Sequence, residues 1–199
     1  MSPRASTTDL LRRTALRMFV DQGFDAVPVT AIAKAAGVSH MTFFRHFPTK
    51  EAVVVNDLFD PLIAAAVRAQ PRQWRPLTRA VRGLVAAISE EPAREEMSSR
   101  EFYERVRLAA LTPSLAAAVR TTGQETERAI AAALVVPGVD DAAARAAAGA
   151  VMGAASSLLL AWAGENNAPD AGATSTATST TGDAATVLSR GLLSLLGES

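Results

Sequence analysis

The 199-residue sequence contains no cysteine, and this absence excludes disulfide bonds and thiolate metal sites. A chain without thiols is typical of a reducing compartment. The first residues, MSPRASTTDLLRR, lack the apolar core and the cleavage site of a secretory signal. We therefore expect a cytoplasmic protein, and we predict no cofactor.

Aromatic residues are scarce, at 5% of the sequence, and the formal net charge is zero. The charge is nevertheless uneven, because residues 1–50 carry a net charge of +4 and residues 51–199 carry −4. A basic segment on an acidic body is typical of a protein with a local site for a polyanion such as nucleic acid. Chance clustering of charges would also give a difference of this size.

The spacing of apolar residues predicts an all-α fold. Almost no stretch alternates with period two, whereas apolar residues recur every three or four positions along most of the chain. Glycine and proline divide the chain into about nine helices. We expect an N-terminal domain in residues 1–50 and a C-terminal domain in residues 51–199, in which the Ser-, Thr- and Gly-rich residues 164–183 form a mobile loop.

Residues 30–47 fit a helix-turn-helix motif. Thr30 is placed to cap the first helix, Gly37 allows the turn, and Ser39 is placed to cap the second helix. Small alanines on the first helix let the two helices cross closely, so that the second can enter a major groove. The same geometry also occurs in proteins that bind no nucleic acid.

Residues 14–54, TALRMFVDQGFDAVPVTAIAKAAGVSHMTFFRHFPTKEAVV, resemble the DNA-binding domain of the TetR family of one-component repressors. The matching residues are Ala15, Phe19, Gly23, Phe24, Thr30, Ile32, Ala33, Ala36, Gly37, Val38, Ser39, Thr42, Phe43, Phe47, Pro48, Lys50 and Glu51. The resemblance implies a homodimeric repressor of operator DNA whose C-terminal helical domain binds a small-molecule effector.

A narrower resemblance concerns the variant TFFRHFPTKE together with RVRLAALTPSLAAAVRTTGQETERAIAAAL. Both stretches are similar to the branch of the family that contains the mycofactocin-system regulator. This second resemblance implies an effector that is like an acyl-CoA.

The residues expected to contact DNA lie around the second helix of the motif. His40, Met41 and Thr42 occupy its first turn, which faces base edges in this geometry. Arg45 can contact either a guanine or a phosphate, and His46 is either a phosphate donor or a plain surface histidine. The resemblance assigns phosphate contacts to Lys50 and Thr30. The predicted DNA-binding set is Thr30, Ser39, His40, Met41, Thr42, Phe44, Arg45, His46 and Lys50.

Three aromatic residues of this segment separate by helical face. Phe43 and Phe47 are four residues apart, and the resemblance places both in the core against the first helix of the domain. Phe44 lies on another face, at a position where the family usually has a DNA-contacting tyrosine. A phenylalanine can pack on a sugar or a thymine methyl group, or it can be partly buried in the domain. His40 and His46 do not share a helix face, and we predict no metal site.

The C-terminal domain is rich in Ala, Leu and Val, and small side chains can leave room for a ligand. The candidate ligand-binding residues are Trp74, Phe102, Tyr103, Arg107 and Gln124. An acyl-CoA would need a basic mouth, for which the candidates are Arg75, Arg79, Arg105 and Arg107.

The stretch AAAGAVMGAASSLLLAWA (residues 146–163) is long and apolar enough to raise the question of a membrane span. Its two serines, the acidic residues on both sides and the lack of a basic cluster argue against one. The resemblance instead places this helix and the last one in a dimer interface. The candidate dimerisation residues are Gly149, Gly153, Leu188, Leu192 and Leu195.

A ligand-responsive regulator has two alternatives, an architectural DNA-binding protein and an enzyme. An architectural DNA-binding protein would have no effector and would tolerate many DNA sequences. An all-helical enzyme has little support, because the sequence shows no nucleophile–base pair, metal-ligand spacing or phosphate loop. We therefore predict a regulator and no enzymatic activity.

Overall fold

The computed structural model describes residues 6–55, 60–164 and 183–198. Within these ranges the protein consists of eleven α-helices and one short 3-10 helix, which confirms the predicted all-α class. The predicted mobile loop at residues 164–183 lies, except for its two end residues, outside the described residues.

The first helix of the N-terminal part has a capping box at its start and a face of buried residues. At the start of α1 (Thr7–Gln22) the Ser6 hydroxyl accepts a hydrogen bond from the Asp9 N–H, and the Asp9 carboxylate accepts one from the Ser6 N–H. The helix ends at Gly23, whose φ is 86°. It packs on α2 (Val29–Ala35) and α4 (Ala52–Val55), and α3 (His40–His46) packs on α2.

The larger C-terminal part contains seven α-helices. They are α5 (Asp60–Ala69), α6 (Pro76–Ser89), α7 (Ala93–Met97), α8 (Arg100–Leu111), α9 (Ala116–Leu134), α10 (Asp141–Gly164) and α11 (Ala184–Ser194), with the 3-10 helix η1 (Pro113–Leu115) before α9. The total exceeds the predicted nine helices for two reasons. The segment from Lys50, predicted as one helix with a kink at Asp60 and Pro61, is described as α4 and α5 on either side of residues 56–59, which lie outside the described residues. The five-residue α7 is too short to show a periodic pattern.

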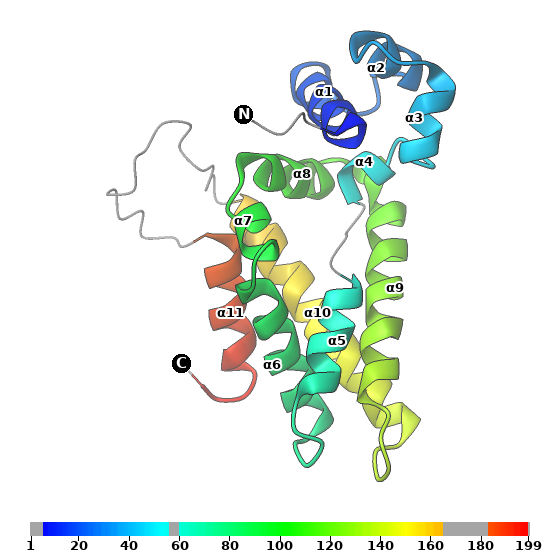
Figure 1. Ribbon diagram of the computed structural model, residues 1–199. Coiled ribbons are helices and arrows are strands. Elements are labelled where there is room, and N and C mark those ends of the chain that lie inside the picture. Colours follow the sequence, from blue (N-terminus) through cyan, green and yellow to red (C-terminus); the bar gives the residue numbers. More distant parts are fainter. Residues whose placement is uncertain (1–5, 56–59, 165–182, 199) are drawn as a thin grey trace.

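The helices bury two separate apolar clusters. One lies among α1 to α4 and extends through Val53 and Val54 to Leu115 of η1. The other lies among the long helices α5, α6, α9, α10 and α11. α8 runs across the top of this bundle beneath α1 (Figure 1), and it contacts α1 and α4 as well as α10. It is therefore the main bridge between the two parts.

Specific contacts fix the bundle helices. A Cβ on Gly83 would lie 2.6 Å from the Cα of Val67, so this glycine lets α5 and α6 approach closely. Arg79 is buried, and its guanidinium donates to the carbonyl oxygens of Leu134 (2.9 Å) and Ala133 (3.2 Å) at the end of α9. Arg79, suggested above for the mouth of a ligand site, instead caps α9.

Asp183 caps the last helix. Its carboxylate accepts a hydrogen bond of 2.8 Å from the backbone N–H of Thr186 and another of 3.3 Å from the Ser98 hydroxyl. Burial alone would raise the pKa of this carboxyl, but the hydrogen bonds from Thr186 and Ser98 outweigh burial and leave the pKa lowered. The ionised cap therefore stabilises α11 and ties it to the end of α7.

Candidate DNA-binding surface and ligand pocket

The helix-turn-helix motif forms as expected in residues 29–46, with one difference at its start. α2 begins at Val29 and its N-cap is Pro28, so the prediction that Thr30 caps this helix is wrong. Thr30 is an exposed residue of the first turn. At the turn Gly37 has a φ of 69°, and the Ser39 hydroxyl then accepts a 3.0 Å hydrogen bond from the Thr42 N–H to cap α3.

The inner face of α3 is fixed to the domain core. Phe43 and Phe47 are fully buried, as expected, and their ring centroids lie 5.7 Å apart. His46 is half-buried, and its Nδ1 lies 2.9 Å from the hydroxyl of Thr8 on α1. This contact ties the end of α3 to the start of α1.

The outer face of α3 presents His40, Met41, Phe44 and Arg45 to solvent. Met41 is 75% exposed and Phe44 is 36% exposed, which is unusual for large apolar side chains. The Phe44 ring stands edge-on to His40 and Phe43, with centroid distances of 4.7 and 5.4 Å. Phe44 therefore keeps a defined position although it is accessible.

Lys50, expected to point toward a phosphate, is turned inward. Its Nζ donates to the carbonyl oxygens of Phe24 (2.8 Å) and Val27 (3.1 Å) and lies 4.2 Å from the centroid of the Phe24 ring. The ammonium thereby holds the loop between α1 and α2 against the start of α4. Two of its three N–H groups are used in this way.

An apolar pocket of about 190 Å³ lies where α4, α8, α9 and α10 meet. Most of its lining is aliphatic, and the polar side chains are few. Its lining residues are Val54, Val55, Phe102, Arg105, Val106, Ala109, Val119, Thr122, Gly123, Thr126, Met152, Ser156, Leu159 and Leu160. The pocket thus touches α4, which carries buried residues of the N-terminal cluster.

Of the five residues expected to bind a ligand, Phe102 lines this pocket. Tyr103 is buried behind it, edge-on to Trp162 at a centroid distance of 5.4 Å. Trp74 lies beneath the Arg82 guanidinium at 5.5 Å, Arg107 is exposed beside a groove between α1 and α8, and Gln124 is exposed on α9. These four residues do not line the pocket. The prediction failed for them because the spacing of residues along a helix does not reveal which helix faces converge in the fold.

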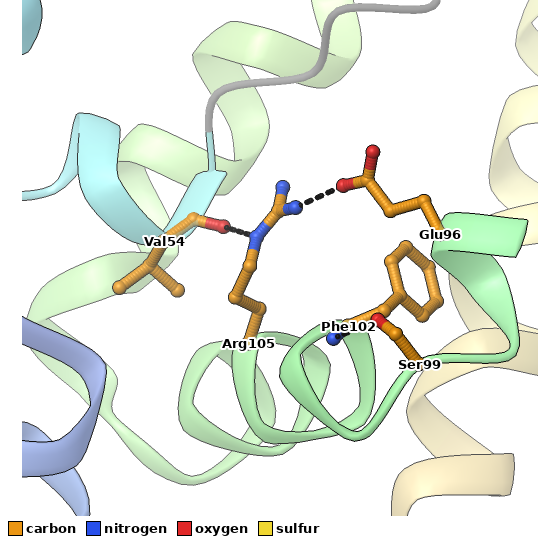
Figure 2. A network of polar contacts seen from close by, with 5 residues as sticks. All are labelled: Val54, Glu96, Ser99, Phe102 and Arg105. Carbon is orange, nitrogen blue, oxygen red and sulfur yellow. Dashed lines mark hydrogen bonds and ion pairs between the residues drawn. The ribbon is translucent and has the colours of Figure 1, made fainter. Parts of the chain in front are cut away.

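Arg105 lines the pocket and contacts both parts of the molecule. Its Nε donates to the carbonyl oxygen of Val54 at 2.9 Å, and its Nη1 lies 2.6 Å from a carboxylate oxygen of Glu96 on α7 (Figure 2). The Arg105 side chain is 9% exposed and that of Glu96 is 29% exposed. One guanidinium therefore lines the pocket, holds the last turn of α4 and is anchored to the bundle. The sequence predicted Arg105 as a candidate for the basic opening of a ligand site, but it did not indicate that Val54 and Glu96 are the partners of Arg105.

A second set of charges lies where α1 meets α8. Arg12 is buried on α1, with its guanidinium 5.6 Å from the centroid of the Phe47 ring. Burial and the charge of Arg105 lower the pKa of Arg12, whereas Glu101 opposes that change. Burial also raises the pKa of Glu101, and Arg12 and Arg105 partly offset it. Charged groups of both signs therefore face each other across the contact between α1 and α8.

The candidate dimerisation residues divide into exposed and buried groups. Gly153 is exposed, Leu195 is 45% exposed, and Gly149 lies half-buried beside the Glu127 side chain. Leu188 and Leu192 are buried in the core of their own chain, so the prediction that they face a partner needs correction. Their four-residue spacing marks one face of a helix, but spacing alone does not say what covers that face.

α10 is the one helix among the described residues that is long and apolar enough to cross a membrane, by length and composition. Only 33% of its most apolar 18-residue window is buried. Its buried face packs on α6, α8, α9 and α11. The exposed part carries the ion pair of Asp141 and Arg145 in its first turns, and further along it presents small residues and Leu160, which is 42% exposed. The helix is thus part of the bundle, and beyond its first turns its outer face carries no charged side chain.

Comparison with known proteins identifies the N-terminal motif. Residues 11–56 match the family model described as bacterial regulatory proteins, tetR family. The HTH-type transcriptional regulator TcmR of Streptomyces glaucescens is 32% identical over 140 residues, which are 67% of this chain and 62% of the relative. The regulator EthR of Mycolicibacterium smegmatis is 45% identical over 53 residues, which are 27% of this chain and 24% of the relative. The aligned regions thus span less than two thirds of either relative.

Solved structures share the fold over almost the whole chain. The fatty acid degradation regulator FadR from Bacillus halodurans matches with a TM-score of 0.56 and 16% identity, over 98% of this chain and 97% of that one. The transcriptional regulator FadR from Bacillus subtilis, solved in complex with stearoyl-CoA, matches with a TM-score of 0.53 and 14% identity, over 94% and 96%. At these identities the likeness concerns the fold.

Proposed function

We propose that this chain, which carries a TetR-family DNA-binding domain in residues 11–56, is a homodimeric transcriptional repressor that leaves its operator when an apolar effector binds. The observation that carries the proposal is the pocket between α4, α8, α9 and α10. A cavity that contacts both the bundle and the last helix of the DNA-binding domain allows a bound molecule to change how the two parts sit together.

The effector class follows from the pocket lining and from one structural neighbour. The lining is mainly Val, Leu, Ala, Met and Phe, with Arg105 as its cation. The Bacillus subtilis neighbour was solved with stearoyl-CoA. Both support an effector with an aliphatic chain, in keeping with the resemblance to the mycofactocin-regulator branch. The basic group for a thioester or carboxylate is then Arg105, since Arg79 caps α9.

We propose that two copies of the chain form a homodimer through the surface of the C-terminal bundle. The candidate interface residues are Gly153 on the outer face of α10, Leu160, which also borders the pocket, and the exposed Leu195 after α11. A second copy of the chain would bury this face, and two domains would then present two α3 helices to successive major grooves. Such a regulator would act on DNA in the cytoplasm.

The test combines DNA binding with ligand release. A fragment from upstream of the protein's own gene is footprinted with the purified protein, and the protection is repeated with stearoyl-CoA and with free stearate. We expect a protected palindromic site that is lost on adding the acyl compound. Absence of any specific protected site, or protection that no acyl compound changes, would count against the repressor and favour an architectural DNA-binding protein.

A pocket variant makes the test specific. A Cβ on Gly123, which lines the pocket, would have no atom of another helix within 4 Å, so Gly123→Leu fills the space without removing a contact. This variant should bind DNA normally and fail to respond to the acyl compound. Gln124→Leu, at the neighbouring exposed position outside the pocket, is the matched control and should respond like the native protein.

A further inference from the structure

Most polar groups around α3 are already engaged within the protein. The Thr42 hydroxyl lies 2.9 Å from that of Ser39, and Nδ1 of His46 lies 2.9 Å from the Thr8 hydroxyl. The Lys50 ammonium donates to two carbonyl oxygens of the loop between α1 and α2. The usual hydrogen-bond donors for base edges are thus partly consumed by the fold.

The side chains that remain outward on α3 are His40, Met41, Phe44 and Arg45, and two of these four are apolar. Met41 is 75% exposed and Phe44 is 36% exposed. Phe44 is held in place by edge-on contacts with His40 and Phe43, so its exposed ring is preorganised rather than loosely placed. Exposure of these groups to water in the free protein is unfavourable, and a partner that covers them recovers that free energy.

The major groove offers a specific match for such groups. Each base pair presents hydrogen-bonding atoms there, and the apolar group among the base edges is the C5 methyl of thymine. We propose that Met41 and Phe44 recognise thymine methyl groups in each operator half-site, so that part of the sequence specificity comes from apolar contact. The inference rests on the proposed function and adds to it the chemistry by which the operator is recognised.

The positive charge of the N-terminal part suits DNA as the partner of this surface. Residues 1–50 carry a net charge of +4, and Arg13, Arg17, Lys34 and Arg45 are exposed in this part of the protein. Phosphate attraction would supply affinity for any duplex, while the apolar pair would distinguish thymine from the other bases. Burial of one methyl group should change the affinity about four-fold.

The test removes single methyl groups from the DNA. A bound duplex is obtained by in vitro selection from random sequences with the full-length protein, and each thymine is then replaced in turn by deoxyuridine. Fluorescence anisotropy gives the Kd of each duplex. We expect a loss of about four-fold at one or more positions in each half-site. The same losses should disappear with Met41→Ala or Phe44→Ala, according to which side chain covers the methyl.

One control variant separates the outcomes. Leu111→Ala changes another exposed apolar residue, on α8 and 66% exposed, and should keep the full response to deoxyuridine. A selected duplex that binds tightly but responds to no deoxyuridine, or a response unchanged in both α3 variants, overturns the inference and leaves the proposed function standing. Failure to select any specific duplex overturns both.

Discussion

Replacing Arg105 by methionine should loosen α4 selectively. The variant keeps an apolar stem in the pocket wall but removes the donor to the Val54 carbonyl and the charge that faces Glu96. A hydrogen bond that involves a charged group contributes about 1.5–3 kcal/mol. Local opening of α4 has to break the bond to Val54, so this opening should become about 10- to 150-fold more frequent.

Amide hydrogen exchange in the ligand-free protein measures this opening. The amides of Val54 and Val55 bond to the carbonyl of Glu51 at 2.9 and 3.0 Å and report on α4. In Arg105→Met they should exchange about 10- to 150-fold faster, while amides in the middle of α10 change much less.

A matched variant separates the two partners of Arg105. Glu96→Gln weakens the ion pair but leaves the Nε bond to Val54, so α4 exchange should stay close to that of the native protein. The reasoning is refuted if Arg105→Met leaves α4 exchange unchanged, or if exchange rises equally in α4 and α10, because the second result would mean global destabilisation.

Three further changes test other parts of the structure. Lys50→Ala should lower the free energy of unfolding by about 1–3 kcal/mol, because the carbonyl oxygens of Phe24 and Val27 lose the ammonium that donates to them. If this variant binds DNA more weakly with an unchanged salt dependence, Lys50 contacts no phosphate. Asp183→Asn should lower the melting temperature at pH 7, and this difference should shrink as the pH falls below the ordinary carboxyl value of 3.8, because a carboxyl with a lowered pKa stabilises the fold above its unfolded pKa and loses this effect as the pH falls through its folded pKa. Gly153→Arg should give a monomer in size-exclusion chromatography, whereas Ala132→Arg on the exposed face of α9 should not.

The sequence predicted the local features of the fold well. Apolar periodicity located most of the helices, and the turn at Gly37 and the cap at Ser39 followed from residue types alone. Thr30 was misassigned because a proline at the N-cap, Pro28, started α2 earlier without a side-chain hydrogen bond. α7 was missed because five residues are too few for a pattern.

The pocket depends on contacts between distant segments, which a single sequence does not reveal. Phe102 was found because aromatic residues are common in ligand sites, whereas Trp74 and Tyr103 are aromatic and pack elsewhere. Lys50 shows the same limit for a charged residue. Its inward position follows from two backbone carbonyls more than twenty residues earlier in the chain, and no feature of the local sequence marks them.

The size of the pocket suggests why the effect of a ligand should depend on its length. A volume of about 190 Å³ is below the ~300–1,000 Å³ typical of ligand sites, so a long acyl chain must displace part of the wall. α8, α9 and α10 have 12, 19 and 24 residues, while α4 has four residues and includes Val54 and Val55. Within the described residues α4 is the shortest helix of the wall, and we expect it to be the part that moves.

Chain length should therefore separate binding from release. Butyryl-CoA should bind without weakening the operator complex, whereas stearoyl-CoA should both bind and release the DNA, because only the longer chain displaces α4. Calorimetry measures binding of each compound to the native protein, and anisotropy at saturating ligand measures release. Equal release at saturation by both compounds would show that displacement of α4 by the chain is not the cause, and the coupling would then have to arise at the head group beside Arg105.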